Sequence, residues 1–120
     1  MTPFGLKMRE WRRKHNLTQQ QQATFLGVSK AYISALETGE RGQPSAIFVD
    51  QICVWLGLIW DEAEDLKRLA SLSHPKPSID ARGQTANAVY LSNLLAQNIN
   101  RLSSEDCGDL IGEIERRIKI

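Results

Sequence analysis

The sequence predicts an all-α protein with a five-helix N-terminal domain, a linker and two C-terminal amphipathic helices. Apolar residues recur at helical intervals along most of the chain, and residues 17–39 have the pattern of two short helices joined at a glycine. With 120 residues, 42% of them hydrophobic and 24% charged, the chain has the length of one small domain plus an appendage and the composition of a folded protein.

Residues 4–15 are predicted to form the first helix, because Phe4, Met8 and Trp11 fall at positions i, i+4 and i+7. Side chains with this spacing lie on one side of a helix and form a stripe that faces the core. The segment is also basic, and it lacks the apolar run that a signal peptide requires.

A second helix is predicted to begin at Thr18, whose hydroxyl is suited to accept a hydrogen bond from the backbone of the first helical turn. Gln21 stands three residues further on, so the pair fits a capping box. Ala23 and Leu26 follow at a helical interval and are expected to face inward. Gly27 then permits the turn, because a positive φ costs glycine little.

The third helix is predicted to follow this turn at once, with Ser29 as its N-cap and Gly39 at its end. Ile33 and Leu36 lie three residues apart and are expected to form its buried edge. Two short helices with a connection of about three to four residues form the arrangement of a helix-turn-helix.

The outer side of this third helix carries residues suited to recognising DNA bases. In a helix-turn-helix, the N-terminal part of the second helix of the pair enters the major groove and contacts base edges. Lysine pairs with guanine O6 or N7, alanine meets the methyl group of thymine, and serine contacts either kind of base. The residues expected to contact bases are Lys30, Ala31, Tyr32, Ser34 and Ala35.

Phosphate contacts are expected beside this surface. Gln19, at the start of the first helix of the pair, is suited to hold a phosphate through its amide and the helix N-terminus. Arg41, in the loop after Gly39, is expected to make a modest contact. Thr18 and Ser29 complete the predicted DNA-binding set.

Four short motifs in this region resemble those of the lambda-repressor-like, or xenobiotic-response-element (XRE), family of DNA-binding domains. They are Leu17-Thr18-Gln19, Gly27-Val28-Ser29, the set Ile33, Ser34, Glu37 and Gly39, and Pro44-Ser45. The resemblance covers about residues 4–60 and implies a sequence-specific DNA-binding domain. The full chain also resembles a group of small alphaproteobacterial regulators, through residues 59–66 and 72–75.

The family often pairs an arginine of the first helix with the glutamate of the third motif, so the resemblance implies a structural ion pair between Arg12 and Glu37. Two positions depart from the family pattern. Gln22 stands where a large apolar residue is usual, and Phe25 stands where a polar residue is usual. We expect a slight rotation of this helix, with Phe25 filling the space.

The charge distribution favours nucleic acid as the partner of the N-terminal segment, although the net charge is only +1. Residues 1–43 carry seven basic and three acidic side chains, whereas the remainder carries eight basic and eleven acidic ones. Other interpretations remain open: Arg13 and Lys14 suit a solvated helix end, Lys30 suits a solvated lysine, and Tyr32 suits packing against its own helix. Paired helices with a glycine turn also occur in proteins that bind no DNA.

Two further helices complete the expected domain, residues 1–72. The fourth opens at Pro44 and Ser45 and ends at Gly57. The side chains expected to face inward from it are Ile47, Phe48, Ile52 and Trp55. The fifth begins with acidic residues, which suit the helix dipole and are not interpreted as catalytic or metal-binding. Its apolar side is expected to consist of Leu66, Leu69 and Leu72.

Residues 73–84 are expected to form a linker, because Pro75 and Pro77 prevent helix there. Residues 85–120 return to two amphipathic helices, which cannot bury both of their apolar stripes alone. A homodimer is favoured, because twofold pairing adds the binding free energies of two half-sites. A hairpin docked on its own domain is the alternative. The residues predicted to mediate dimerisation are Leu91, Leu94, Leu95, Ile99, Leu102, Leu110, Ile111, Ile114 and Ile118.

Catalysis has little support in the sequence, and no metal or cofactor is expected. His15 lies in a basic helix end and His74 in the proline linker, and no catalytic triad, phosphate-binding glycine loop or metal-ligand cluster is visible. No apolar run of about 18 residues predicts a membrane span. Cys53 and Cys107 lie far apart and form no CxxC, which favours a reducing compartment, most simply the cytoplasm.

The sequence therefore predicts a small, dimeric, cytoplasmic transcription factor that binds an inverted repeat of double-stranded DNA and acts most simply as a repressor on the nucleoid. A second hypothesis is an antitoxin-type interaction protein, whose C-terminal helices bind a toxin or another protein partner.

Overall fold

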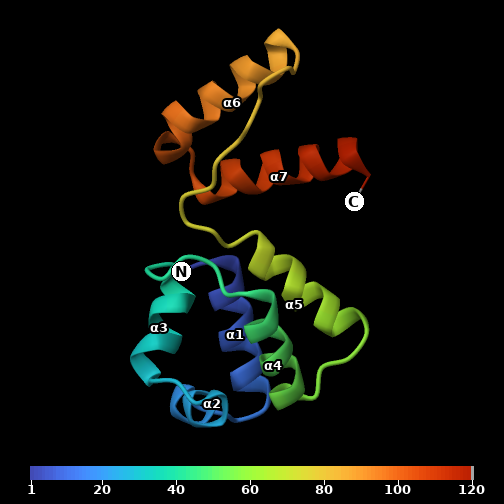
Figure 1. The fold of residues 1–120 in the computed structure, drawn as a ribbon. Helices are drawn as coiled ribbons and strands as arrows, with labels where there is room; N and C mark the ends of the chain where they lie inside the picture. The colour runs from blue at the N-terminus through green and yellow to red at the C-terminus, as the bar shows by residue number, and fades with distance from the viewer. Residues whose placement is uncertain (120) are drawn as a thin grey trace. The chain divides into compact units, whose positions relative to one another are not determined.

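A computed structural model describes residues 1–119 and divides the chain into two compact units, Met1–Pro77 and Ser78–Ile120. The first unit holds α1 (Pro3–Lys14), α2 (Gln19–Leu26), α3 (Lys30–Thr38), α4 (Ala46–Leu56) and α5 (Asp61–Ser71) (Figure 1). The second holds α6 (Ala86–Asn98), the 3-10 helix η1 (Ile99–Arg101) and α7 (Ser104–Ile118). The described residues contain helices and connections but no strand, which confirms the all-α class.

The core of the first unit lies between α1, α4 and α5. The stripe expected on α1 is confirmed, since Phe4, Met8 and Trp11 are all buried. This stripe packs with buried side chains of α4, α5 and the loop between them, namely Val49, Ile52, Cys53, Leu56, Leu58, Leu66 and Ala70. α2 packs against α3 and α4, and α3 packs against α1. The core therefore anchors the helix pair α2–α3.

The buried face of α4 differs from the expected one. Ile47 was expected inside but is 73% exposed, whereas Phe48 and Trp55 are half-buried and pack against the core. The buried residues are Val49, Ile52, Cys53 and Leu56. Because α4 is apolar on nearly every side, hydrophobic periodicity does not identify which side faces the core.

The end of α5 also differs from the expectation. Leu72 lies beyond the helix and is 60% exposed, whereas Ala70 is buried in its place. The buried Ser73 caps the start of α1: its Oγ accepts a hydrogen bond from the backbone N–H of Phe4 at 2.9 Å and donates to the carbonyl of Leu69 at 2.6 Å. The first unit therefore continues past α5 into the segment expected to begin the linker.

The second unit consists of α6, η1 and α7 without a core of its own. None of these three helices has a buried residue, and none of residues 78–119 is buried. The first of the two helices expected within residues 85–120 ends at Asn98 and is continued by η1. Along the part of the chain that the structure describes, no helix is long and apolar enough to cross a membrane.

Gly5 marks the closest approach between α1 and α3. A Cβ atom on Gly5 would lie 2.2 Å from the carbonyl oxygen of Glu37, a backbone atom that cannot rotate away. We therefore expect Gly5→Ala to lower the free energy of unfolding by about 1–3 kcal/mol, the usual cost of overpacking, as measured by urea denaturation. Gly112→Ala is the matched control, because Gly112 is also helical but has no neighbour within 4 Å. An equal response of the two variants would contradict the prediction.

Candidate nucleic-acid interface

Local hydrogen bonds fix the ends of α2 and α3. The capping box is confirmed: the Thr18 hydroxyl accepts from the Gln21 N–H at 3.1 Å, and the Gln21 side chain accepts from the Thr18 N–H at 2.8 Å. Gly27 ends α2 in the left-handed region, with φ of 71°. The hydroxyl of Ser29 then accepts from the N–H of Tyr32 at 3.0 Å and begins α3. The sequence between the helices thus specifies a short, defined turn.

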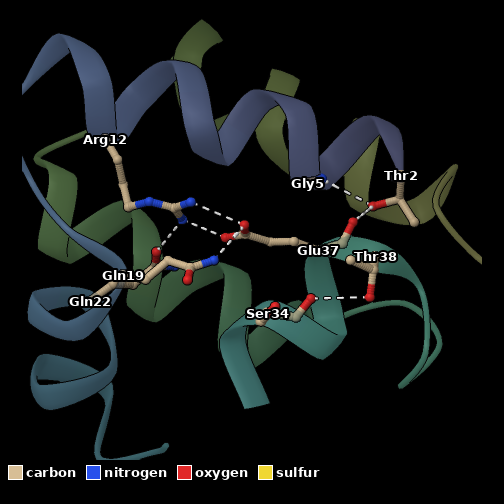
Figure 2. Close-up of polar contacts among 8 residues, drawn as sticks. All are labelled: Thr2, Gly5, Arg12, Gln19, Gln22, Ser34, Glu37 and Thr38. Carbon is tan, nitrogen blue, oxygen red and sulfur yellow. Dashed lines mark hydrogen bonds and ion pairs between the residues drawn. The ribbon is translucent and has the colours of Figure 1, made fainter. Parts of the chain in front are cut away.

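A buried polar network holds α1, α2 and α3 together (Figure 2). Arg12 and Glu37 are 6% and 1% exposed, and they form an ion pair in which both guanidinium Nη atoms contact the carboxylate. The Gln22 side-chain oxygen accepts from Arg12 Nη1 at 2.7 Å, and Gln19 Nε2 donates to Glu37 Oε1 at 3.1 Å. Each carboxylate oxygen therefore has a donor, which is what makes a buried charge tolerable.

This network shows that the expected rotation of α2 was wrong. Gln22 is 1% exposed, whereas Phe25, which was expected to fill the space, is 54% exposed. The Phe25 ring instead lies 6.3 Å from the ring of Trp55. Gln22 tolerates burial because its side-chain oxygen is hydrogen-bonded to Arg12. A glutamine at an apolar position within reach of a buried arginine was the available signal.

The outer face of α3 consists of Lys30, Ala31, Ser34, Ala35 and Thr38. Lys30, Ala31, Ser34 and Thr38 are exposed and Ala35 is half-buried, while Ile33, Leu36 and Glu37 point into the domain. Thr38 was not among the residues predicted to contact DNA, although it follows Ala31 and Ser34 at helical spacing. The Thr38 hydroxyl donates to the carbonyl of Ser34 at 3.2 Å, so it remains able to accept a hydrogen bond from outside.

Tyr32 lies at the edge of this face and packs against α4. It is half-buried, with its ring edge-on to Phe48 at a centroid distance of 5.9 Å. The guanidinium of Arg41 lies 5.8 Å from the centre of the same ring. This contact holds the exposed Arg41 cation beside α3.

The remaining residues of the predicted DNA-binding set lie at helix starts. Thr18 and Ser29 are exposed N-caps of α2 and α3. Gln19 is half-buried, and its amide is directed to Glu37 (Figure 2). The structure therefore places two side-chain cations, Lys30 and Arg41, beside small polar groups and two helix N-termini on the exposed sides of α2 and α3.

The residues predicted to mediate dimerisation all lie in the second unit. Leu95 and Leu102 are half-buried, and the others are exposed. On α7 the exposed fractions run from 42% for Leu110 to 59% for Ile118. Such a series of apolar side chains on successive turns is uncommon on the surface of a monomeric protein.

The family model of the helix-turn-helix domain matches residues 3–66. Two proteins of Bacillus subtilis (strain 168) are similar to the chain. The uncharacterized HTH-type transcriptional regulator RghRB is 41% identical over 56 residues, which are 47% of this chain and 40% of that protein. The HTH-type transcriptional repressor RghR is 40% identical over 52 residues, which are 43% of this chain and 38% of that protein. The match thus spans about two fifths of each relative, and no solved structure matches significantly.

Proposed function

The chain belongs to the helix-turn-helix domain family, and from this premise we propose that it is a sequence-specific DNA-binding transcriptional regulator. The outer face of α3 carries the proposal, because it is exposed while the opposite side of the same helix is locked to α1 and α2 through Glu37. A rigid helix with an exposed face of small side chains fits into the major groove without displacing its own domain. The names of the two relatives, both of them transcriptional regulators, support a role in transcriptional regulation.

In this proposal, Lys30, Ala31 and Ser34 contact base edges. Lysine donates to guanine O6 or N7, serine donates or accepts, and alanine packs against a thymine methyl group. Tyr32 and Ala35 complete this surface at its border with α4. Because Ala31, Ser34 and Ala35 have short side chains, the backbone of α3 can approach the bases closely.

Phosphate contacts come from the flanks of α3. Arg41 carries a charge beside the helix, and the N-termini of α2 and α3, at Thr18 and Ser29, present backbone N–H groups. The amide nitrogen of Gln19 has two hydrogens, of which Glu37 accepts one, so the other remains for a phosphate oxygen. Gln19 thereby connects the buried ion pair to the DNA backbone.

The second unit supplies dimerisation in this proposal. None of the apolar side chains of α6, η1 and α7 is buried within their own unit, and a second copy is the occupant that a regulator of twofold operators requires. Two linked domains bind an inverted repeat, and occupancy of a promoter represses it by excluding polymerase. The name of RghR as a transcriptional repressor supports this sign of regulation.

Selection of bound fragments from genomic DNA by the full-length protein at physiological salt tests the proposal. We expect one inverted repeat with half-site centres about 34–36 Å, or one helical turn, apart. Recovery of only unrelated fragments, whose binding is lost as the salt concentration rises, would mean that binding is driven by charge and not by sequence. In that case a toxin or another protein becomes the better candidate for the partner of α6 and α7.

The substitution Lys30→Ala tests base recognition separately. We expect it to relax preference at one position of each half-site, at a cost of about 1–3 kcal/mol for the preferred base. Arg41→Ala is the comparison: it should weaken binding to all sequences alike and reduce the slope of log affinity against log salt by about one. Binding of randomised operators measures both effects. A base preference that Lys30→Ala leaves unchanged at every position removes Lys30 from the base-contacting set.

A further inference from the structure

α7 carries an apolar stripe whose spacing is the same in both directions. Cys107, Ile111, Ile114 and Ile118 follow one another at intervals of four, three and four residues. On a helix with 3.6 residues per turn, this spacing keeps all four side chains on one side. The stripe is therefore symmetric about a point between Gly112 and Glu113.

The three isoleucines of this stripe are exposed. Ile111, Ile114 and Ile118 are 55%, 47% and 59% exposed, and Cys107 is half-buried. α7 itself has a capping box and internal ion pairs that make it a defined helix: Ser103 and Asp106 cap its start, and Glu113 contacts Arg116 and Arg117. A preformed helix with an uncovered apolar stripe is suited to pairing with another helix.

Charge along α7 selects the direction of that pairing. The first part of the helix carries only acids, at Glu105, Asp106 and Asp109. The bases Arg116, Arg117 and Lys119 all lie at the other end, where Glu113 and Glu115 offset part of their charge. A parallel pair sets acids against acids and bases against bases, whereas an antiparallel pair sets each acidic end against a basic end. Opposed helix dipoles favour the same direction.

We propose that α7 pairs in antiparallel orientation with α7 of a second copy, about a twofold axis between Gly112 and Glu113. The proposal rests on the homodimer put forward above and specifies its interface. In this arrangement Ile111 lies opposite Ile114 of the second copy, and Cys107 lies opposite Ile118 of the second copy. Charges at the rim of such an interface set orientation more than affinity, so the isoleucines supply the stability.

The side chains that flank the stripe fit this arrangement. Gly108 lies opposite Glu115 of the second copy, and no atom lies within 4 Å of the position that a Cβ on Gly108 would take. The side chain of Glu115 of the second copy therefore has room to extend past Gly108. On the other flank, the aliphatic part of Arg117 covers Leu110 of the second copy, which is 42% exposed in one copy alone.

The native thiol at Cys107 allows the direction to be measured in the full-length protein. In the antiparallel pair, the two Cys107 residues are separated by about 16 Å along the helix axis, at 1.5 Å per residue, which is too far for a disulfide. We therefore expect no covalent dimer from the wild type under mild oxidation with diamide. Ile118→Cys places a second thiol opposite Cys107 of the other copy, and this variant should form covalent dimers on non-reducing gels.

Two controls make the result specific. Removing the native thiol with Cys107→Ser in the Ile118→Cys background should abolish the cross-link, because the introduced thiols are also too far apart. Cys53 interferes little, since it is buried in the first unit and burial raises the pKa of its thiol, which keeps it protonated.

The remaining outcomes overturn the proposal in distinguishable ways. Covalent dimers of the wild type, or of the variant that lacks Cys107, would show a parallel pair. Light scattering on the same samples gives the oligomeric state. Dimers that no thiol pair cross-links would place the interface away from this stripe and leave the homodimer standing. Monomers would remove both the homodimer and this interface.

Discussion

Replacing Glu37 by alanine should lower the free energy of unfolding by about 3–5 kcal/mol, because it leaves a buried guanidinium without its counter-charge. Arg12 is only 6% exposed, so its guanidinium has little contact with solvent to offset the lost carboxylate. Gln19 loses the acceptor of its amide hydrogen at the same time. Urea denaturation, followed by the tryptophan fluorescence of the first unit, measures the change.

The exposed neighbour Glu40 provides the control for this substitution. Glu40→Ala also removes a glutamate carboxylate, but from an exposed position two residues after the end of α3. It should therefore change the unfolding free energy by no more than about 0.5 kcal/mol. If the loss from Glu37→Ala is as small as this, the ion pair does not stabilise the domain.

A double substitution separates the ion pair from the network around it. Arg12→Met combined with Glu37→Leu removes both charges together, and apolar replacement of a buried pair is often nearly neutral. Here the second substitution should restore only part of the lost unfolding free energy, because Gln22 is 1% exposed and would lose the hydrogen-bond donor that Arg12 provides. The double variant should therefore be more stable than Glu37→Ala alone and less stable than the wild type.

The elements that sequence analysis predicted well are those set by neighbouring residues. The stripe Phe4, Met8 and Trp11 and the caps at Thr18 and Ser29 each depend on side chains within two turns of one another. Local spacing and hydrogen bonding determine such features whatever the rest of the fold does. The helix-turn-helix unit consists almost entirely of such local features, so its helices and turn could be predicted from residue types.

The features that were missed depend on contacts between distant segments. Gln22 is buried because Arg12 of another helix donates to it, and Ser73 is buried because it caps α1 from the far end of the domain. Ile47 was predicted to face inward from α4 but is exposed. The helix is apolar on nearly every side, so only its packing against α1 and α5 determines which side is buried. Periodicity contains no information about such partners.

Replacing Ile111 by aspartate should convert the proposed dimer into monomers and lower affinity for the full operator on the order of 100-fold or more. Ile111 is near the centre of the α7 stripe, where the antiparallel pair would bury the new carboxylate against Ile114 of the second copy. Burial of an unpaired charge costs several kcal/mol, and each 1.4 kcal/mol is a tenfold change in an equilibrium constant. Light scattering and titration of the selected operator measure the two losses on the same sample.

The same substitution at Ile47 serves as the matched control. Ile47 is an isoleucine of α4 that is 73% exposed and belongs to neither the outer face of α3 nor the α7 stripe. Ile47→Asp should therefore leave the oligomeric state as it is in the wild type. Ile111→Asp should in turn leave the urea midpoint of the first unit and binding to a single half-site near the wild-type values, because the helix-turn-helix is untouched. A dimer of Ile111→Asp with full operator affinity would mean that the two copies meet elsewhere.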